Sequence, residues 1–175
     1  MFRLMTLILV LIFPLRSFGA LLFEPVAGYS DGKLVLSDDI DMDGFSYGGR
    51  IGYGGHNFQI AYDFLQSSFD IDKTVENFKT TEHGLFLGLR FWHMRLFAEF
   101  IASAEGVIGD ADFNNGDGPK FGVNFYLFRN LSIEASWREL DYDDVDGDIS
   151  EDYGYKAYFL GLTFPFELFG KSRRK

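Results

Sequence analysis

Gly44 to Gly55 read GFSYGGRIGYGG, and this stretch decides the fold. Bulky and small or polar residues alternate along it, which is the period of a β-strand with two unlike faces. The bulky face carries Phe45, Tyr47, Ile51 and Tyr53, and the other face carries Ser46, Gly48, Arg50 and Gly52. A strand of this kind predicts a sheet with one face in an apolar surrounding and one narrow, polar face.

The same period recurs along the rest of the chain. The opening segment Phe23–Ser30 shows it least clearly, and no segment sustains helical spacing of apolar residues. Eight strands are therefore predicted. The other six segments with this alternation are Asn57–Phe64, Glu82–Trp92, Arg95–Ala104, Pro119–Phe128, Leu131–Leu140 and Tyr155–Phe166.

The connections between these strands alternate in length. Short ones lie near residues 54–56, 93–94 and 129–130, and long, acidic ones span roughly residues 33–43, 66–81, 105–118 and 142–152. This alternation is typical of an up-and-down meander with all short turns at one end and all long loops at the other. The sequence therefore predicts an all-β, eight-stranded antiparallel up-and-down transmembrane β-barrel.

The composition of the narrow face indicates whether the polar face points into the barrel or out of it. It combines glycines with charges of both signs, and glycine suits a tight lumen better than a solvent-facing strand. We therefore expect the charges to pair inside the barrel and the bulky face to meet lipid. A periplasmic, soluble lipocalin-like barrel binding an apolar ligand, with the bulky face inward, remains an alternative, as does a narrow small-solute channel. The predicted interior ion network consists of Arg50, Asp63, Arg90, Glu99, Lys120, Glu134 and Arg138.

The first residues, MFRLMTLILVLIFPLRSFGA, have the pattern of a secretory signal peptide: Arg3, an apolar run and small residues near Gly19. We expect cleavage after Gly19. The predicted division is a signal peptide over residues 1–19, a barrel over residues 20–167 and a basic C-terminal tail over residues 168–175.

The composition excludes several classes of function. The 175 residues include no cysteine, which removes disulfides, thiolate metal sites and a cysteine nucleophile. The formal net charge is −10, and no basic stripe interleaved with aromatics offsets it, so no nucleic acid is expected as a partner.

The alternation of short turns and long loops, the strand GGRIGYGG (Gly48–Gly55) and the closing strand YFLGLTFPF (Tyr158–Phe166) together resemble the small eight-stranded outer-membrane barrels of Gram-negative bacteria, the family of the OmpA membrane domain and OmpX-like proteins. The resemblance covers the mature chain. It implies an outer-membrane location with extracellular loops and periplasmic termini, with outer-membrane lipid and lipopolysaccharide as neighbours. It also implies that Phe166 or Phe164 serves as the signal for the barrel assembly machinery, although here the chain continues as ELFGKSRRK.

Few residues suggest further chemistry. Asp39, Asp41 and Asp43 precede Gly44 like the first half of a calcium loop, but Arg50 stands where the last ligand would be. They are a weak divalent-cation candidate. Catalysis by a histidine is not expected, because His56 and His93 lie in the predicted short turns, away from the outer leaflet, and His83 has no H-x-S arrangement around it. We expect no cofactor, no enzymatic activity and a structural or surface-interaction role with an unidentified extracellular ligand.

Overall fold

A computed structural model describes residues 20–35, 39–55, 57–72, 77–109, 111–145 and 153–170. Within these ranges the chain forms strands and no helix, and no helix there could cross a membrane. Most strands are about fifteen residues long, which is well above the usual five or six. The strands are β1 (Ala20–Val35), β2 (Ile40–Gly54), β3 (Phe58–Ile71), β4 (Asn77–Phe91), β5 (Met94–Ile108), β6 (Ala111–Phe128), β7 (Leu131–Val145), β8 (Tyr153–Thr163) and β9 (Phe166–Gly170).

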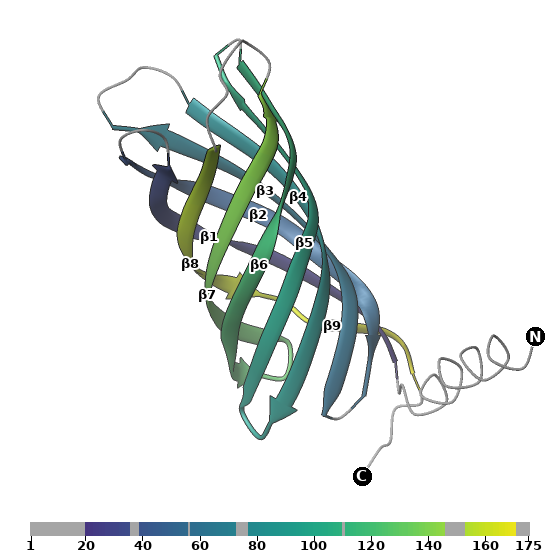
Figure 1. The fold of residues 1–175 in the computed structure, drawn as a ribbon. Coiled ribbons are helices and arrows are strands. Elements are labelled where there is room, and N and C mark those ends of the chain that lie inside the picture. Colours follow the sequence, from purple (N-terminus) through teal and green to yellow (C-terminus); the bar gives the residue numbers. More distant parts are fainter. Residues whose placement is uncertain are drawn as a thin grey trace, which may run out of the picture.

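The strands form one closed antiparallel barrel (Figure 1). Consecutive strands from β1 to β8 pair with one another, and β1 closes the sheet by pairing with β8 as well as β2. The short β9 pairs with the beginning of β1, beyond the break that Phe164 and Pro165 make after β8. The predicted eight-stranded up-and-down barrel is therefore confirmed. β9 is an addition, because the last strand was expected to end at Phe166 and residues 168–175 were expected to form a tail.

The register of the strands fixes the tilt and width of the barrel. Following paired residues from Leu22 through all eight strands returns to β1 at Gly32, ten residues farther along. A stagger of this size over eight strands requires a tilt of roughly 35–45° and leaves an interior just wide enough for side chains. The partners on this path are Gly52, Ala61, Phe86, Glu99, Lys120, Arg138 and Ala157.

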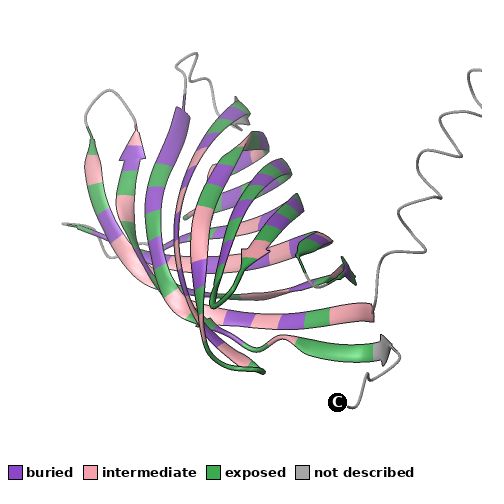
Figure 2. Cartoon of the chain, turned by 90° about the horizontal axis from the view of Figure 1, so that it is seen from below, coloured by how far each residue is buried: buried purple, intermediate pink, exposed green. Residues whose placement is uncertain are grey.

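The two faces of the strands differ as the period predicts (Figure 2). Aromatic and aliphatic side chains point outward over the half of the barrel nearer the short turns, where we call them the apolar belt. This observation contradicts the lipocalin-like alternative, which requires the bulky face to point inward. Exposed members of the belt include Tyr29, Phe45, Tyr47, Ile51, Tyr53, Tyr62, Leu85, Leu87, Leu89, Leu96, Phe100, Phe121, Phe125, Tyr158, Leu160 and Leu162.

In the described residues, the first three expected long loops are mostly strand. β1 continues to Val35 before β2 begins at Ile40, and β5 continues to Ile108 before β6 begins at Ala111. Residues 66–71 and 77–81 likewise belong to β3 and β4. The long connections are therefore β-hairpins that extend the barrel wall.

Candidate functional site

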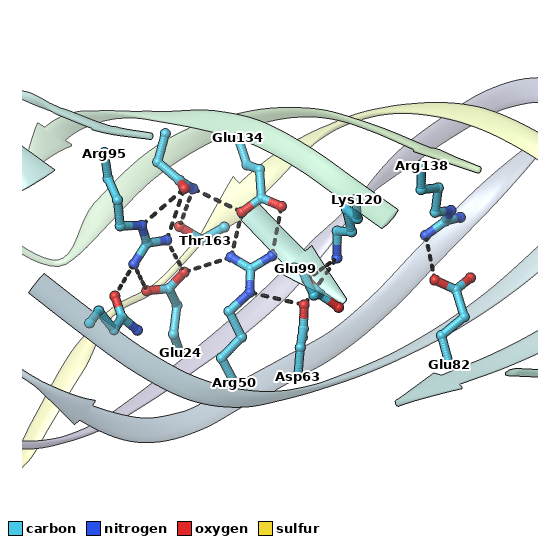
Figure 3. Close-up of polar contacts among 12 residues, drawn as sticks. Glu24, Arg50, Asp63, Glu82, Arg95, Glu99, Lys120, Glu134, Arg138 and Thr163 are labelled. Carbon is cyan, nitrogen blue, oxygen red and sulfur yellow. Dashed lines mark hydrogen bonds and ion pairs between the residues drawn. The ribbon is translucent and has the colours of Figure 1, made fainter. Parts of the chain in front are cut away.

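The lower interior, nearer the short turns, is built around Arg50 of β2 (Figure 3). Its guanidinium donates to Glu24 at 3.0 Å, to Asp63 at 3.1 Å and to both oxygens of Glu134 at 2.5 and 2.7 Å. The side chains of all four residues are at most 1 % exposed. Phe86 also lies against the guanidinium, at 4.5 Å from the ring centre.

Arg95 of β5 adds a second cation toward the short-turn end. It donates to Glu24 at 2.5 and 2.7 Å, to Gln59 at 2.5 Å and to the Asn124 amide oxygen at 2.9 and 3.1 Å. The Asn124 amide in turn donates to Glu134 at 2.9 Å. Arg50 and Arg95 thus share Glu24 directly and Glu134 through an amide, which makes one connected network across the lumen.

Lys120 of β6 extends the network upward. Its ammonium lies 3.0 Å from a carboxylate oxygen of Asp63 and 3.0 Å from one of Glu99. Glu99 fits here because its side chain lies against a glycine of β4: a Cβ on Gly84 would lie 2.5 Å from the Glu99 Oε1 atom. The glycines of the narrow face therefore make room for ionised side chains.

Above Lys120, Arg138 forms a separate polar layer. It lies 3.3 Å from Glu82 and donates to Ser67 at 3.0 Å, and Tyr155 donates a hydrogen bond to the same glutamate. Ser46 donates to Ser67 at 2.8 Å, continuing the layer to β2.

An aromatic plug fills the barrel above this layer. Phe78 lies 6.1 Å from Phe69, 5.7 Å from Phe113 and 5.7 Å from Tyr155 between ring centres. Burial raises the pKa of Tyr155 and also that of Tyr142, so both phenols stay neutral. We define the plug as Phe69, Phe78, Phe113, Tyr142, Tyr153 and Tyr155, which belong to one buried apolar cluster.

The outer face becomes polar at the level where the inner face becomes apolar. On β4, Leu85, Leu87 and Leu89 are exposed in the belt, whereas Asn77 and Lys79 take the outward positions around the plug residue Phe78. The wall therefore reverses its polarity along each strand. Below the reversal it suits hydrocarbon outside, and above it suits water outside.

The hairpins above the belt carry a strongly acidic outer surface. Among the described residues, twelve acids and three lysines are exposed or half-exposed at this end. We call the acids the acidic crown: Asp31, Asp39, Asp41, Asp43, Asp70, Asp72, Glu105, Asp112, Asp117, Glu139, Asp141 and Asp143.

The structure brings six of the seven expected interior charges together and separates Arg90 from them. Arg90 is half-buried near the short turns, with its guanidinium 4.0 Å from the centre of the Tyr126 ring, and it makes no ion pair among the described residues. The reason is position: Arg90 follows the inward alternation of β4 but lies next to the turn at Trp92. The six that lie together in the interior are Arg50, Asp63, Glu99, Lys120, Glu134 and Arg138.

Sequence reasoning missed Glu24, Glu82 and Arg95. Glu82 lies two residues before Gly84, and Arg95 lies two residues before Phe97. The two-residue period alone therefore places both side chains on the narrow face. Glu24 stands in the least regular segment, where its pairing with two arginines is a tertiary effect.

Asp39, Asp41 and Asp43 do not converge. The Lys33 ammonium lies 3.8 Å from Asp39 and 3.6 Å from Asp41, and Asp43 accepts a hydrogen bond from Tyr29. No group of three or more potential metal-ligating side chains occurs in the described part of the chain. The divalent-cation site therefore stays a prediction.

The described histidines lie outside the interior. His83 faces outward on β4, with a ring nitrogen 2.5 Å from the Tyr62 hydroxyl and its ring 5.2 Å from that of Phe64. The His93 ring lies against Trp92 at a short turn, 4.9 Å between ring centres and tilted by 43°. His56 lies outside the described residues.

An eight-stranded up-and-down barrel with this sidedness is the fold of the small outer-membrane barrels. Ail, the attachment invasion locus protein of Yersinia pestis, matches with 16 % identity, 84 % of this chain and 99 % of that chain covered, and a TM-score of 0.60. Neisserial surface protein A matches with 18 % identity, 82 % and 97 % coverage and a TM-score of 0.56. OprG of Pseudomonas aeruginosa matches with 10 % identity, 87 % and 99 % coverage and a TM-score of 0.51.

The resemblance to small outer-membrane barrels is thereby confirmed at the level of the fold. No protein-family model matches this sequence, and a search of curated proteins gave no match.

Proposed function

We propose that this protein is an integral outer-membrane barrel with a closed interior, whose hairpins present an acidic contact surface outside the cell. The observation that carries the proposal is the reversal of polarity along the strands. In the belt the wall is apolar outside and ionic inside, and around the plug it is polar outside and apolar inside. This arrangement suits strands that leave a bilayer and enter water.

The dimensions of the belt support the membrane part of this proposal. On β2 the outward apolar residues run from Phe45 to Tyr53, nine residues of tilted strand. A membrane-spanning strand needs about 9–11 residues. Asp43 and Asp41 follow on the same face, so the belt ends sharply toward the hairpins.

A structural or contact role is favoured over transport because two barriers follow one another in the lumen. Arg50 and its carboxylate partners fill the lower interior, and the aromatic plug fills the upper interior. A conducted solute would have to break several buried ion pairs and displace packed rings.

The hairpins are suited to hold a contact surface away from the membrane. The plug gives their strands a packed core, so the acidic crown sits on a rigid base. Ail has been crystallised with a heparin analogue, sucrose octasulfate. The twelve acids of the crown would repel such a polyanion, so we expect a cationic rather than a sulfated partner for this chain.

Two further assignments belong to the proposal. The acyl chains of lipopolysaccharide and phospholipid would cover the belt, and the barrel assembly machinery would recognise the end of the last strand. Phe164 and Phe166 are exposed at that end and could supply its aromatic signal. Catalysis forms no part of the proposal.

Expression of the full chain in a Gram-negative host tests this function. We expect the protein in the outer-membrane fraction, with an unheated form that migrates differently from the heated form on a denaturing gel. Because the chain has no cysteine, Lys79→Cys and Asn130→Cys give unique labels at the two ends of the barrel. A membrane-impermeant maleimide should label the first in intact cells and the second only after permeabilisation.

Recovery of the protein in an aqueous periplasmic extract would contradict the membrane location. Labelling of Asn130→Cys in intact cells, with Lys79→Cys protected, would contradict the orientation. Stepwise conductance of the purified protein in a planar bilayer would contradict the closed interior.

A further inference from the structure

The buried interior holds one more acid than base. Among the described residues, the fully buried charged side chains comprise five carboxyl groups and four cations. A charge without a partner in such a place costs several kcal/mol, so a compensating charge is required. The acids are Glu24, Asp63, Glu82, Glu99 and Glu134, and the cations are Arg50, Arg95, Lys120 and Arg138.

Arg90 does not supply the missing charge. It is half-buried near the short turns and its nearest described partner is the Tyr126 ring. Gly84 pairs with Asp63, and Arg90 is six residues farther along the same strand. At ~3.3 Å per residue the distance along the strand is about 20 Å.

The imbalance concentrates on one pair of acids. Asp63 and Glu99 converge on the single ammonium of Lys120, at 3.0 Å each (Figure 3), and their carboxyl groups lie within hydrogen-bonding reach of each other. The other oxygen of Asp63, Oδ1, has no hydrogen-bond donor in the described structure, whereas Glu99 Oε2 has the Lys120 ammonium at 3.0 Å. An unsatisfied buried acceptor on Asp63, beside a second carboxyl group, indicates a missing donor.

The surrounding charges single out Glu99. Asp63 has two cationic partners, Arg50 on β2 and Lys120 on β6, whereas Glu99 has a single cation within salt-bridge distance among the described residues, Lys120. Across the lumen, Arg138 of β7 already pairs with Glu82 of β4.

The other charged groups around Asp63 and Glu99 already have partners in ion pairs or hydrogen bonds. Glu134 of β7 is held by both terminal nitrogens of Arg50, and Glu24 of β1 is held by Arg50 and Arg95. On β8, Ala157 and Phe159 face this part of the lumen and carry no charge.

We propose that the interior is a proton-binding site: Glu99 takes up one proton from solvent and shares it with Asp63. The neutral carboxyl then donates a hydrogen bond to its neighbour, and the interior becomes electrically balanced with four anions and four cations. Two adjacent carboxyl groups that share one proton are a stable arrangement because both do not ionise together. This inference does not depend on the proposed function.

Infrared spectroscopy of the full-length protein in phosphatidylcholine vesicles at pH 7.5 tests the proposal directly. Solvent-exposed acids are ionised at this pH. We expect a carboxylic-acid C=O band that is absent in Glu99→Gln. It should persist in Glu139→Gln, which alters a half-exposed acid paired with Lys156 on the outer surface. Absence of the band in the wild type, or its persistence in Glu99→Gln, would overturn the proposal.

Stability provides an independent readout. Glu99→Gln keeps the shape and supplies a permanent donor, so its unfolding equilibrium constant in urea should change by less than about threefold. Glu134→Gln is the matched control, because it removes a charge that Arg50 binds through two hydrogen bonds. It should raise that constant by more than about tenfold.

Equal destabilisation by the two variants would contradict proton binding at Glu99. A bound sodium ion would also balance the charge. Stability that rises with sodium chloride but not with choline chloride, together with no carboxylic-acid band, would show that occupant and overturn the proposal.

Discussion

Replacement of Arg50 by methionine is the sharpest test of the interior network. Arg50 contacts three carboxylates through four hydrogen bonds of 2.5–3.1 Å, and its side chain is 0 % exposed. The variant keeps an unbranched side chain and removes only the guanidinium. It leaves Glu24 with Arg95, Asp63 with Lys120 and Glu134 with the Asn124 amide.

Loss of one partner from a buried ion pair costs about 3–5 kcal/mol. At 1.36 kcal/mol per tenfold change, this corresponds to roughly 10²- to several 10³-fold in the unfolding equilibrium constant. A total stability of about 5–15 kcal/mol would leave the barrel folded but much weakened.

The assay is urea unfolding of the protein in lipid vesicles, followed by tryptophan fluorescence and by the shift between folded and unfolded gel bands. Arg129→Met is the matched control, because Arg129 pairs with Glu167 at a similar 3.1 Å but with side chains 77 % and 54 % exposed. It should cost less than about 1 kcal/mol. Equally small losses in both variants would refute the idea that the network holds the barrel together.

Three further predictions concern the plug and the glycines. Phe78→Ala should cost about 3–5 kcal/mol and speed proteolysis of the hairpins without preventing membrane insertion, because the ring lies above the belt. Gly84→Ala should cost about 1–3 kcal/mol in urea unfolding, since the new Cβ would lie 2.5 Å from a carboxylate oxygen, whereas Gly49→Ala, with its nearest atom at 3.5 Å, should be nearly neutral. Burial raises the pKa of Tyr142 and Tyr155 above the ordinary value of 10.0, so stability present at neutral pH should be lost above about pH 10, where the unfolded phenols ionise. Tyr142→Phe should reduce that loss of stability at alkaline pH and leave stability near pH 7 unchanged, because the Tyr142 hydroxyl has no hydrogen-bond partner in the described structure. Tyr155→Phe should cost about 1–3 kcal/mol of stability at pH 7, since the Tyr155 hydroxyl donates a hydrogen bond to a buried glutamate.

The belt and the barrel could be predicted because one physical signal determines both. Period-two alternation fixes which side chains share a face, as with Tyr47 and Ile51 outward and Arg50 inward. The glycines and the charges of both signs on the inner face then distinguish a lipid-facing barrel from one with an apolar lumen.

The plug could not be predicted by the same reasoning, because the alternation continues there with opposite polarity. Phe69 lies between Ser68 and Asp70 on β3, a pattern that resembles an acidic loop with an isolated aromatic residue. Its inward position follows only from the unbroken pairing of Phe69 with Phe78 on β4.

Which residues form ion pairs with one another could not be predicted from the sequence either. Arg50 and Glu134 are 84 residues apart and meet across the lumen. The period places Phe86 and Phe97 on the same face as Gly84 and Glu99, but their contact with the Arg50 guanidinium depends on the stagger of the barrel.

Chemical accessibility along β4 tests the central claim most directly. The chain has no cysteine, so a single cysteine can replace each outward residue from Lys79 to Leu89 in turn. In vesicles, a water-soluble maleimide should label Lys79→Cys and leave Leu85→Cys, Leu87→Cys and Leu89→Cys unlabelled until detergent and denaturant are added. Uniform labelling of all four positions in the folded protein would contradict an apolar belt immersed in lipid.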